Sequence, residues 1–433
     1  MMVLGVYCFR NDLRLHDNPA LQLAQKECDQ LLFVYAFEDR LWRTKKPKRI
    51  SAHRAKFTLD SLKCLEKKII KLGGALHFLH GNIESSIPPF MEQVGATLCF
   101  VSDENAWEEK EAEDELSRMV NLRTIYSKTL LHLDDLPFDL EGLPETFSNF
   151  RKLVEKQWLV RSSLETPDTL DLSPHPVSKL PNLRELGFKN PPAPPSDYYR
   201  FEGGTIAGRK RVERWIWEEN CILNYKNTRN QLQGADFSSR LSPWISNGCL
   251  SPREIYWEIK KFESHFEANE STYWLTFELL WRDFFHFSAR LHGPKIFKSR
   301  GIHPERPPIT EPQNAGSLFS QWKDGRTNDL FINAMMHELR KTGWMSNRAR
   351  QISASYLIND LGLDWRKGAQ WFEEQLIDYD PCSNYGNWLY LSGYGNDPRK
   401  KRHFNVAKQA ELYDPEGNYL RDWVRVQNSP ISN

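Results

Sequence analysis

The sequence predicts an α/β domain built on a doubly wound, parallel, five-stranded sheet, followed by an all-α domain. Short apolar runs alternate with amphipathic segments up to about residue 130, and a proline-rich stretch follows them. From about residue 204 the apolar residues recur at helical spacing. A chain of 433 residues is long enough for two or three domains. We therefore predict domains at 1–133 and 204–433, joined by a linker at 134–203.

The predicted strands of the first domain are short runs of β-branched and aromatic residues. They lie near 4–9, 31–37, 75–80, 97–101 and 123–127. Amphipathic segments at 53–72 and 107–120 predict helices between them. Parallel sheets of this kind bind ligands at the carboxyl ends of their strands. The first strand leads into Arg10 and Asn11 and not into a glycine-rich loop, so the sequence does not support a standard NAD or ATP site.

Proline content predicts a linker after the first domain, and N-cap residues predict where the helices of the second domain begin. Residues 134–200 hold 10 of the 25 prolines, which predicts a linker that runs over the surface, with a helical part at about 146–157. Ser251, Pro252 and Glu254 form a capping sequence that predicts a helix start. Further helix starts are expected near Ser271, Asn328, Ser346 and Asp364.

The composition excludes several classes of protein. No run of eighteen apolar residues occurs, so no membrane span is expected. The N-terminal run has no basic lead and no cleavage site, which predicts a cytoplasmic protein. Seven scattered cysteines predict neither a disulfide framework nor a metal site. The net charge of +1 restricts any nucleic-acid contact to a local patch, such as the basic run at 399–402.

Two strings in the helical domain could bind a ligand. The segment 238–243 combines hydroxyls, a guanidinium and a proline turn, which can bind a pyrophosphate but also suit an ordinary turn. Trp274, Glu278, Trp281 and Phe285 recur at helical spacing and form one stripe. A carboxylate among aromatic rings is costly to bury without a partner. The stripe therefore predicts either a packed helix with an internal ion pair or the wall of a ligand pocket.

Two further strings lie closer to the C-terminus. Arg348 and Arg350 lie in the first turn of a predicted helix and can meet an anionic ligand or a carboxylate, and the expected partners are the carboxylates Asp378 and Asp380 of the next motif. Asp380, Asn384 and Trp388 are each four residues apart, so on a helix they share one face. A polar amide between an acid and an indole packs poorly in a core, which favours a binding site here.

Together these strings resemble the photolyase/cryptochrome flavoprotein family, and specifically its cryptochrome-DASH branch. The matching motifs are FRNDLRLHDNPAL at 9–21, YKNTRN at 225–230, SRLSPW at 239–244, FELLWRDFF at 277–285, WMSNRARQ at 344–351 and DYDPCSNYGNW at 378–388. They appear in the order of the family and cover nearly the whole chain.

The resemblance implies that the helical domain binds FAD folded into a U. The residues implied around the cofactor are Tyr225, Ser238, Ser239, Arg240, Leu241, Ser242, Arg282, Asn347, Arg350, Asp378, Asp380 and Asn384. Trp388, Trp365 and Trp322 match the family's electron-transfer chain, which would run from the flavin to Trp322 at the surface. Many members also carry a folate antenna, such as methenyltetrahydrofolate, which would lie against the N-terminal sheet. No antenna residues can be assigned in this sequence.

The activity implied is blue-light-driven repair of cyclobutane pyrimidine dimers by electron transfer from reduced flavin, in a monomer that binds mainly single-stranded DNA. The implied lesion pocket consists of Glu278, Trp281, Asn347, Arg348, Gln351, Tyr390 and Gln409, with Glu278 as the acid. Gln351 and Tyr390 replace the Met and Trp of the main repair class, which is typical of the DASH branch and predicts the single-strand preference.

Two alternatives stay open at this point. A non-catalytic blue-light photoreceptor would share the flavin site, and a nucleotide-binding α/β protein without flavin would give a colourless preparation. One departure from the family pattern is Asn333, which stands in place of an acid, so a salt bridge of the helical domain is expected to be missing.

Overall fold

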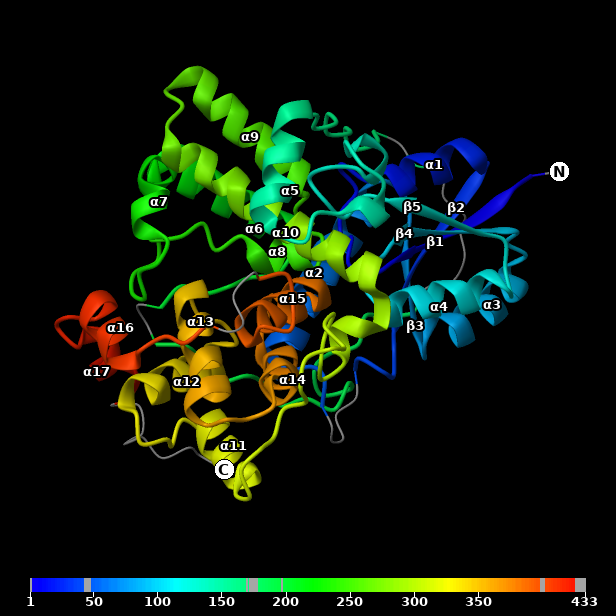
Figure 1. Cartoon of the computed structure of the whole chain (residues 1–433). Helices are drawn as coiled ribbons and strands as arrows, with labels where there is room; N and C mark the ends of the chain where they lie inside the picture. The colour runs from blue at the N-terminus through cyan, green and yellow to red at the C-terminus, as the bar shows by residue number, and fades with distance from the viewer. Residues whose placement is uncertain are drawn as a thin grey trace.

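The computed structural model describes residues 2–42, 48–168, 170, 178–195, 198–397 and 402–424. Figure 1 shows a sheet flanked by helices, coloured blue to cyan, beside a larger helical part that is coloured green to red. This architecture confirms the predicted fold class. The predicted domain boundaries stay a prediction, because the largest core cluster continues from the sheet into the helical part.

Five parallel strands form the sheet. They are β1 (Leu4–Phe9), β2 (Gln30–Phe37), β3 (Leu76–His80), β4 (Leu98–Asp103) and β5 (Leu122–Tyr126), in the order β3-β2-β1-β4-β5. Each predicted strand overlaps one of them. Because β1 lies in the middle and pairs with both β2 and β4, the chain winds outward in both directions, as in a doubly wound sheet.

Helices cover both faces of this sheet. The face that carries Tyr7 and Phe9 packs against α1 (Pro19–Glu27) and α2 (Ala52–Lys71). The opposite face, with Val6 and Cys8, packs against α3 (Ile83–Val94) and α4 (Trp107–Ser117). The alternation of side chains along β1 therefore separates two apolar cores.

The segment after the sheet is more deeply packed than a surface linker. It contains η1 (Leu133–Asp135), η2 (Leu140–Gly142), α5 (Phe147–Val154) and η3 (Glu155–Gln157), which confirms the predicted helical part. Phe147, Phe150 and Val154 are buried in the main core, and their helix lies beside α10 (Glu270–His292) in Figure 1. The expectation that the whole segment runs over the surface is therefore wrong for α5, because its apolar face packs against α10.

The helical part consists of helices of very different length. Apart from α10 these are α6 (Thr205–Val212), η4 (Glu213–Glu218), η5 (Cys221–Asn224), α7 (Tyr225–Thr228), α8 (Ser242–Ser246), α9 (Pro252–His265), η6 (Gly293–Phe297), α11 (Ala315–Asp324), α12 (Leu330–Thr342), α13 (Asn347–Ser355), η7 (Tyr356–Asp360), α14 (Trp365–Gln375), α15 (Pro381–Ser392), α16 (Val406–Tyr413) and α17 (Asn418–Val424).

The predicted helix starts agree with the structure within two residues. Ser251, Ser346 and Asp364 are the N-caps of α9, α13 and α14, and each side chain accepts a backbone N–H. The capping role expected of Glu254 is wrong. Its two carboxylate oxygens instead pair with His16 and Arg209, each at 2.6 Å, and so tie α9 to the loop after β1.

Two buried carboxylates join the sheet part to the helical part. Asp17 pairs with Arg253 of α9 at 2.5 Å. Asp283 of α10 accepts the backbone N–H groups of Leu130 and Leu131 at 3.0 and 2.8 Å. Burial raises the pKa of Asp283 to about 7. These contacts fix the position of α10, which carries one wall of the site described below.

Membrane and disulfide chemistry were both predicted to be absent. In the described ranges, no helix combines the length and the apolar character needed to cross a membrane. All seven cysteines lie within these ranges and are free thiols.

Candidate functional site

A cavity of about 570 Å³ lies between α10, α13 and the start of α15. Its lining includes Tyr225, Ser238, Ser239, Arg240, Leu241, Ser242, Glu278, Trp281, Arg282, Asn347, Arg348, Arg350, Gln351, Asp378, Asp380 and Tyr390. A smaller cavity of about 80 Å³ shares Asn347, Arg350, Asp378 and Asp380 with it and adds Asn384 and Trp388. The structure thus brings together most residues that the sequence analysis assigned to a cofactor and to a lesion.

The floor of the large cavity contains a buried ion pair. Arg350 Nη2 lies 2.8 Å from Asp378 Oδ2, and the Ser242 hydroxyl donates to the same oxygen at 2.6 Å. The Asp378 side chain is 2% exposed, and its Oδ1 has no hydrogen-bond partner among the described residues. The expected pairing of Asp378 with Arg350 is confirmed, and it leaves one buried acceptor free for a ligand.

Asp380 starts α15 and orients the face that carries Asn384. Its carboxylate accepts the backbone N–H groups of Cys382 and Ser383, while His286 Nε2 lies 3.0 Å from Oδ2. Burial alone would raise the pKa of Asp380, but His286 and Arg282 hold it well below its usual range. Asp380 therefore stays ionised at the edge of both cavities.

His286, Asp380 and Cys382 place their potential ligand atoms within 4.8 Å of one another. His286 and Asp380 are hydrogen-bonded to each other, and the Asp380 side chain caps α15. These contacts account for the proximity of the three side chains without a metal ion, and the predicted absence of a metal site stays a prediction.

The loop at 238–242 borders the cavity on another side. Arg211 donates to the carbonyl oxygens of Ser238 and Ser239 at 2.8 and 2.9 Å and so fixes the loop. The Arg240 guanidinium lies over the rings of Trp344 and Phe237, 4.3 and 5.0 Å from their centroids. Arg240 also lines the cavity, and its Nε and Nη1 have no hydrogen-bond partner among the described residues. Cation–π contacts orient the guanidinium, and its role in binding a phosphate stays a prediction.

The wall formed by α10 combines an acid with aromatic rings. Glu278 Oε1 accepts from Arg229 Nη1 at 2.8 Å and from Trp274 Nε1 at 3.1 Å. Burial raises the pKa of Glu278, although Arg229 opposes this shift. Both alternatives for this stripe hold in part, since the acid has an ion-pair partner and also faces a cavity. Trp274 belongs to the predicted stripe, whereas Arg229 was not predicted as a site residue, although it lies in the YKNTRN motif.

Trp281 stands further along the same wall. Its ring stacks on Phe147 with centroids 3.8 Å apart and planes at 12°, and it meets Tyr390 edge-on at 5.4 Å. Phe147 belongs to α5, so the segment predicted as a linker supports this indole from behind. This contact could not be predicted from local patterns, because the two residues lie 134 positions apart.

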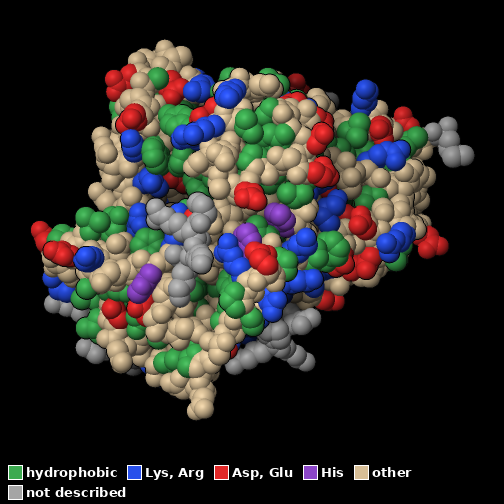
Figure 2. Space-filling model, viewed as in Figure 1, with side chains coloured by type: hydrophobic (Ala, Val, Ile, Leu, Met, Phe, Trp, Pro, Cys, Tyr) green, Lys and Arg blue, Asp and Glu red, His purple; other side chains and the backbone are tan. Residues whose placement is uncertain are grey.

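The rim of the cavity toward the C-terminus is basic. Arg402 lies over the Tyr390 ring, 4.4 Å from its centroid, and Arg348 lies over the Tyr413 ring at 5.0 Å. Figure 2 shows Lys and Arg side chains gathered along the middle of the molecular face. Of the basic run at 399–402, residues 399–401 lie outside the described residues. Gln409 lies on α16 and does not line the cavity. Its place in the lesion pocket stays a prediction.

The three tryptophans of the expected electron path are all buried. Trp388 packs on Gly368 of α14, where a β-carbon would lie 2.2 Å from its Cη2. The same helix carries Trp365 one turn earlier. The Trp322 ring lies 6.4 Å from that of Trp388 and is 0% exposed. The expectation that Trp322 ends the path at the surface is therefore wrong.

Asn333, which stands in place of an acid, forms hydrogen bonds with Thr327. Its Oδ1 accepts from the backbone N–H and the hydroxyl of Thr327 at 2.7 and 2.8 Å, and its Nδ2 donates to the Thr327 carbonyl at 2.9 Å. The amide therefore makes three hydrogen bonds to Thr327 at the position where the family has an acid.

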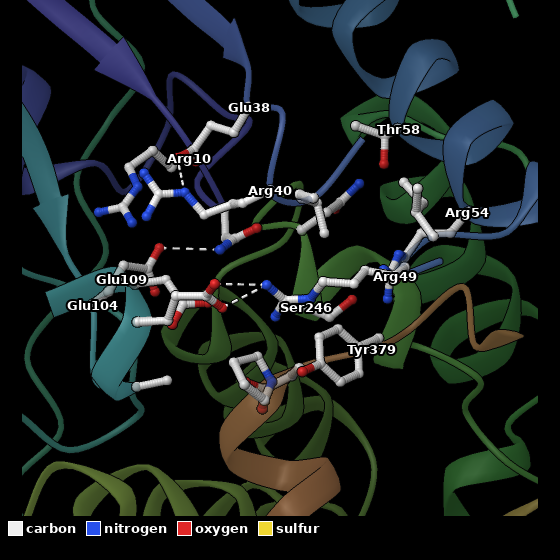
Figure 3. A pocket seen from close by; sticks show the side chains of 18 of the residues that line it. Arg10, Glu38, Arg40, Arg49, Arg54, Thr58, Glu104, Glu109, Ser246 and Tyr379 are labelled. Carbon is white, nitrogen blue, oxygen red and sulfur yellow. Dashed lines mark hydrogen bonds and ion pairs between the residues drawn. The ribbon is translucent and has the colours of Figure 1, made fainter. Parts of the chain in front are cut away.

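A third cavity, of about 120 Å³, lies where the carboxyl ends of β1, β2 and β4 meet the helical part, and it shares Ser246, Arg282 and Asp380 with the large cavity. Figure 3 shows that carboxylates and guanidiniums face each other across it. Arg49 links Glu108 at 2.7 Å with Glu373 at 2.5 Å. Three of the acids near β4, Glu104, Glu108 and Glu109, line this cavity.

Comparison with known proteins gives matches over both parts of the chain. The family models described as "DNA photolyase" and "FAD binding domain of DNA photolyase" match residues 5–170 and 274–430. Cryptochrome DASH of Danio rerio is 42% identical over 429 residues, which are 96% of this chain and 82% of that protein. The Arabidopsis thaliana protein named cryptochrome DASH, chloroplastic/mitochondrial, is 42% identical over 432 residues, or 96% of this chain and 74% of that protein. A crystal structure of a Synechocystis sp. PCC6803 cryptochrome has a TM-score of 0.92 and 39% identity, and the match covers 99% of this chain and 91% of that one.

Proposed function

The chain belongs to the photolyase/cryptochrome family, with cryptochrome DASH relatives along nearly its whole length. We propose that it is a blue-light-driven, FAD-dependent enzyme that repairs cyclobutane pyrimidine dimers, preferentially in single-stranded DNA. One observation carries this proposal: a single cavity is lined both by most of the residues assigned to the flavin and by most of those assigned to the lesion. An electron donor and its acceptor would therefore lie side by side.

The large cavity is suited to FAD. The volume of this cavity, about 570 Å³, lies within the range of about 300–1,000 Å³ for ligand sites. The free Oδ1 of Asp378 offers an acceptor to a ring N–H, and the hydroxyls and backbone amides of 238–242 offer donors to phosphates. Bound FAD would supply the absorption of blue light and, when reduced, one electron for the dimer. Asn384, in the adjoining small cavity, would face the ring nitrogen that gains a proton.

The upper wall would hold a dimer turned out of its strand. Trp281 offers an apolar surface to the splayed bases, and Arg348 and Arg402 place cations near the mouth for the flanking phosphates. Glu278 would donate a hydrogen bond or a proton to a pyrimidine carbonyl as negative charge develops there. Because burial raises the pKa of Glu278, its protonated form is accessible for this role.

The decisive experiment combines a spectrum with a repair assay. The purified protein should show the absorbance of bound flavin. After chemical reduction and blue light it should restore the thymines of a dimer in a single-stranded oligonucleotide, and repair in a duplex should be slower. Flavin absorbance without repair would favour the non-catalytic photoreceptor, and a colourless preparation would contradict both.

The proposal also includes a second chromophore, a cytoplasmic location and a monomeric state. A folate antenna would lie in the cavity at the strand ends, which at about 120 Å³ is smaller than a usual ligand site. A cytoplasmic monomer agrees with the free thiols, and cell fractionation and gel filtration would test it. Cell fractionation is informative because the name of the Arabidopsis relative gives chloroplasts and mitochondria as its compartments.

Replacement of Trp281 with alanine is expected to weaken binding of dimer-containing single strands by about 1–3 kcal/mol through lost stacking. Fluorescence anisotropy titrations of labelled oligonucleotides would measure the change in Kd. Trp257→Ala is the matched control, because that indole is 40% exposed on α9 and does not line the cavity. An unchanged Kd for Trp281→Ala would remove Trp281 from the lesion pocket.

Replacement of Glu278 with glutamine keeps the shape of the side chain but removes the acid. We expect fewer dimers repaired per absorbed photon and only a modest loss of binding, because a glutamine cannot transfer a proton to the carbonyl. Glu258→Gln is the control, since Glu258 also accepts from an indole, Trp217 Nε1 at 3.0 Å, but lies on α9 outside the cavity. A wild-type quantum yield in Glu278→Gln would contradict the proposed role.

A further inference from the structure

The tryptophans of the electron path do not reach the surface. Trp365 and Trp322 are both 0% exposed. In the described part of the chain, the ring contacts of Trp322 are with Trp388, Phe319 and Phe372, and phenylalanine is too hard to oxidise to continue the path. An external reductant therefore needs another redox-active side chain that links these indoles to solvent.

Tyr385 makes such a link. Its ring meets that of Trp365 edge-on, with centroids 6.1 Å apart and planes at 80°. It lies on α15 one helical turn before Trp388, so Trp365 and Trp388 are both its neighbours. Tyrosine, like tryptophan, is a side chain that a photochemical oxidant of this kind can oxidise.

Glu373 gives the phenol a proton acceptor. The Tyr385 hydroxyl donates to Glu373 Oε2 at 3.3 Å, and Glu373 Oε1 accepts from Arg49 Nε at 2.5 Å. Burial, and then the negative charge of Glu373, raises the pKa of Tyr385 far above its usual value, so the phenol carries its proton at rest. An oxidised phenol is a strong acid, and a carboxylate within hydrogen-bond reach can take the proton as the electron leaves.

Tyr385 also has access to solvent. It lines an open surface cavity of about 320 Å³ together with Phe297, Asp364, Arg366, Lys367 and Gln370. The residue is 6% exposed, in contrast to the two indoles behind it. A small reductant in this cavity would thus touch the ring of Tyr385 but not the ring of Trp365.

We propose that Tyr385 is the terminal electron donor of this path, with Glu373 as its proton acceptor. Tyr385 gives one electron to the oxidised Trp365, and its hydroxyl proton passes to Glu373, which leaves a neutral tyrosyl radical. An external thiolate then returns one electron to the oxygen of Tyr385, Glu373 returns the proton, and the thiyl radicals combine to a disulfide. This step rests on the proposed function only in requiring bound, photoreducible FAD.

Electron paramagnetic resonance of the holoenzyme tests this directly. Illumination of the oxidised holoenzyme without reductant, followed by freezing, should trap a tyrosyl radical, and incorporation of deuterated tyrosine should change its hyperfine pattern. Tyr385→Phe should lose this signal and photoreduce slowly with a thiol, while repair by the chemically reduced holoenzyme persists. Repair thus reports on the proposed function separately from the radical.

Three further variants distinguish a redox role from a structural one. Tyr385→Trp restores an oxidisable ring, so photoreduction should recover without a tyrosyl signal. Glu373→Gln should slow radical formation, because the amide cannot accept the proton. Tyr419→Phe is the control, since Tyr419 also donates to a buried glutamate, Glu338 at 2.6 Å, but its ring contacts Phe331 and not the indoles of the path. A tyrosyl signal that survives in Tyr385→Phe, or the lack of one in the wild-type protein, would overturn the proposal.

Discussion

Replacement of Arg350 with alanine is expected to yield protein that is nearly free of flavin and less stable. Arg350 is the ion-pair partner of Asp378, whose side chain is 2% exposed. Removal of one partner of a buried pair costs about 3–5 kcal/mol, because the other charge stays buried without compensation. Since Arg350 itself is 23% exposed, water can partly replace it, and we expect the lower end of this range. The ratio of flavin to protein absorbance and the Tm of the apoprotein would measure the two effects.

Two further variants separate loss of the site from loss of the fold. Arg326→Ala is the control, because Arg326 is 64% exposed and pairs with Asp324 at the surface, where such pairs contribute about 0–1 kcal/mol. In the double variant Arg350→Met with Asp378→Asn, both charges are gone, so stability should recover while flavin binding stays lost. Normal flavin content in Arg350→Ala would contradict the assignment of this pair to the cofactor floor.

Much of the fold could be predicted because local signals and the long-range structure agree. The strand runs, the caps Ser251, Ser346 and Asp364, and the four-residue spacing on α15 are all set by residues close in sequence. The cavity lining was predicted because its residues belong to motifs of a known family. The charge pattern alone did not separate an internal ion pair from a ligand pocket, and the wall of α10 contains both.

Contacts between distant segments could not be predicted from the sequence. Whether Trp322 reaches the surface depends on how α11 packs against α14 and α15, which no local pattern records. The aromatic contacts of Arg240 need Trp344 and Phe237, both outside the short motif of Arg240. Likewise, α5 supports Trp281 only because Phe147 reaches it across the fold. In each case the tertiary environment of the residue, and not its sequence neighbours, determines which groups it contacts.

Replacement of Trp388 with phenylalanine is expected to block light-driven reduction of the flavin nearly completely. Trp388 lines the small cavity beside Asn384, so its indole is placed to donate the first electron. Phenylalanine keeps a flat apolar ring, which limits the loss of packing against Phe372 and Gly368, but it cannot be oxidised under these conditions. Loss of oxidised-flavin absorbance under blue light with an external thiol would measure the effect.

Repair by the chemically reduced Trp388→Phe holoenzyme should persist, because that electron passes directly to the dimer and does not use the indoles. The paired measurement is therefore photoreduction in one sample and dimer repair after dithionite reduction in the other, both normalised to bound flavin. Trp423→Phe is the control, since its indole is 4% exposed and its ring contact is with Tyr198, away from the cavities at α15. Normal photoreduction in Trp388→Phe would mean that the path starts at another residue. Normal flavin content with loss of repair would mean that Trp388 shapes the lesion site, and would contradict its assignment to the electron path alone.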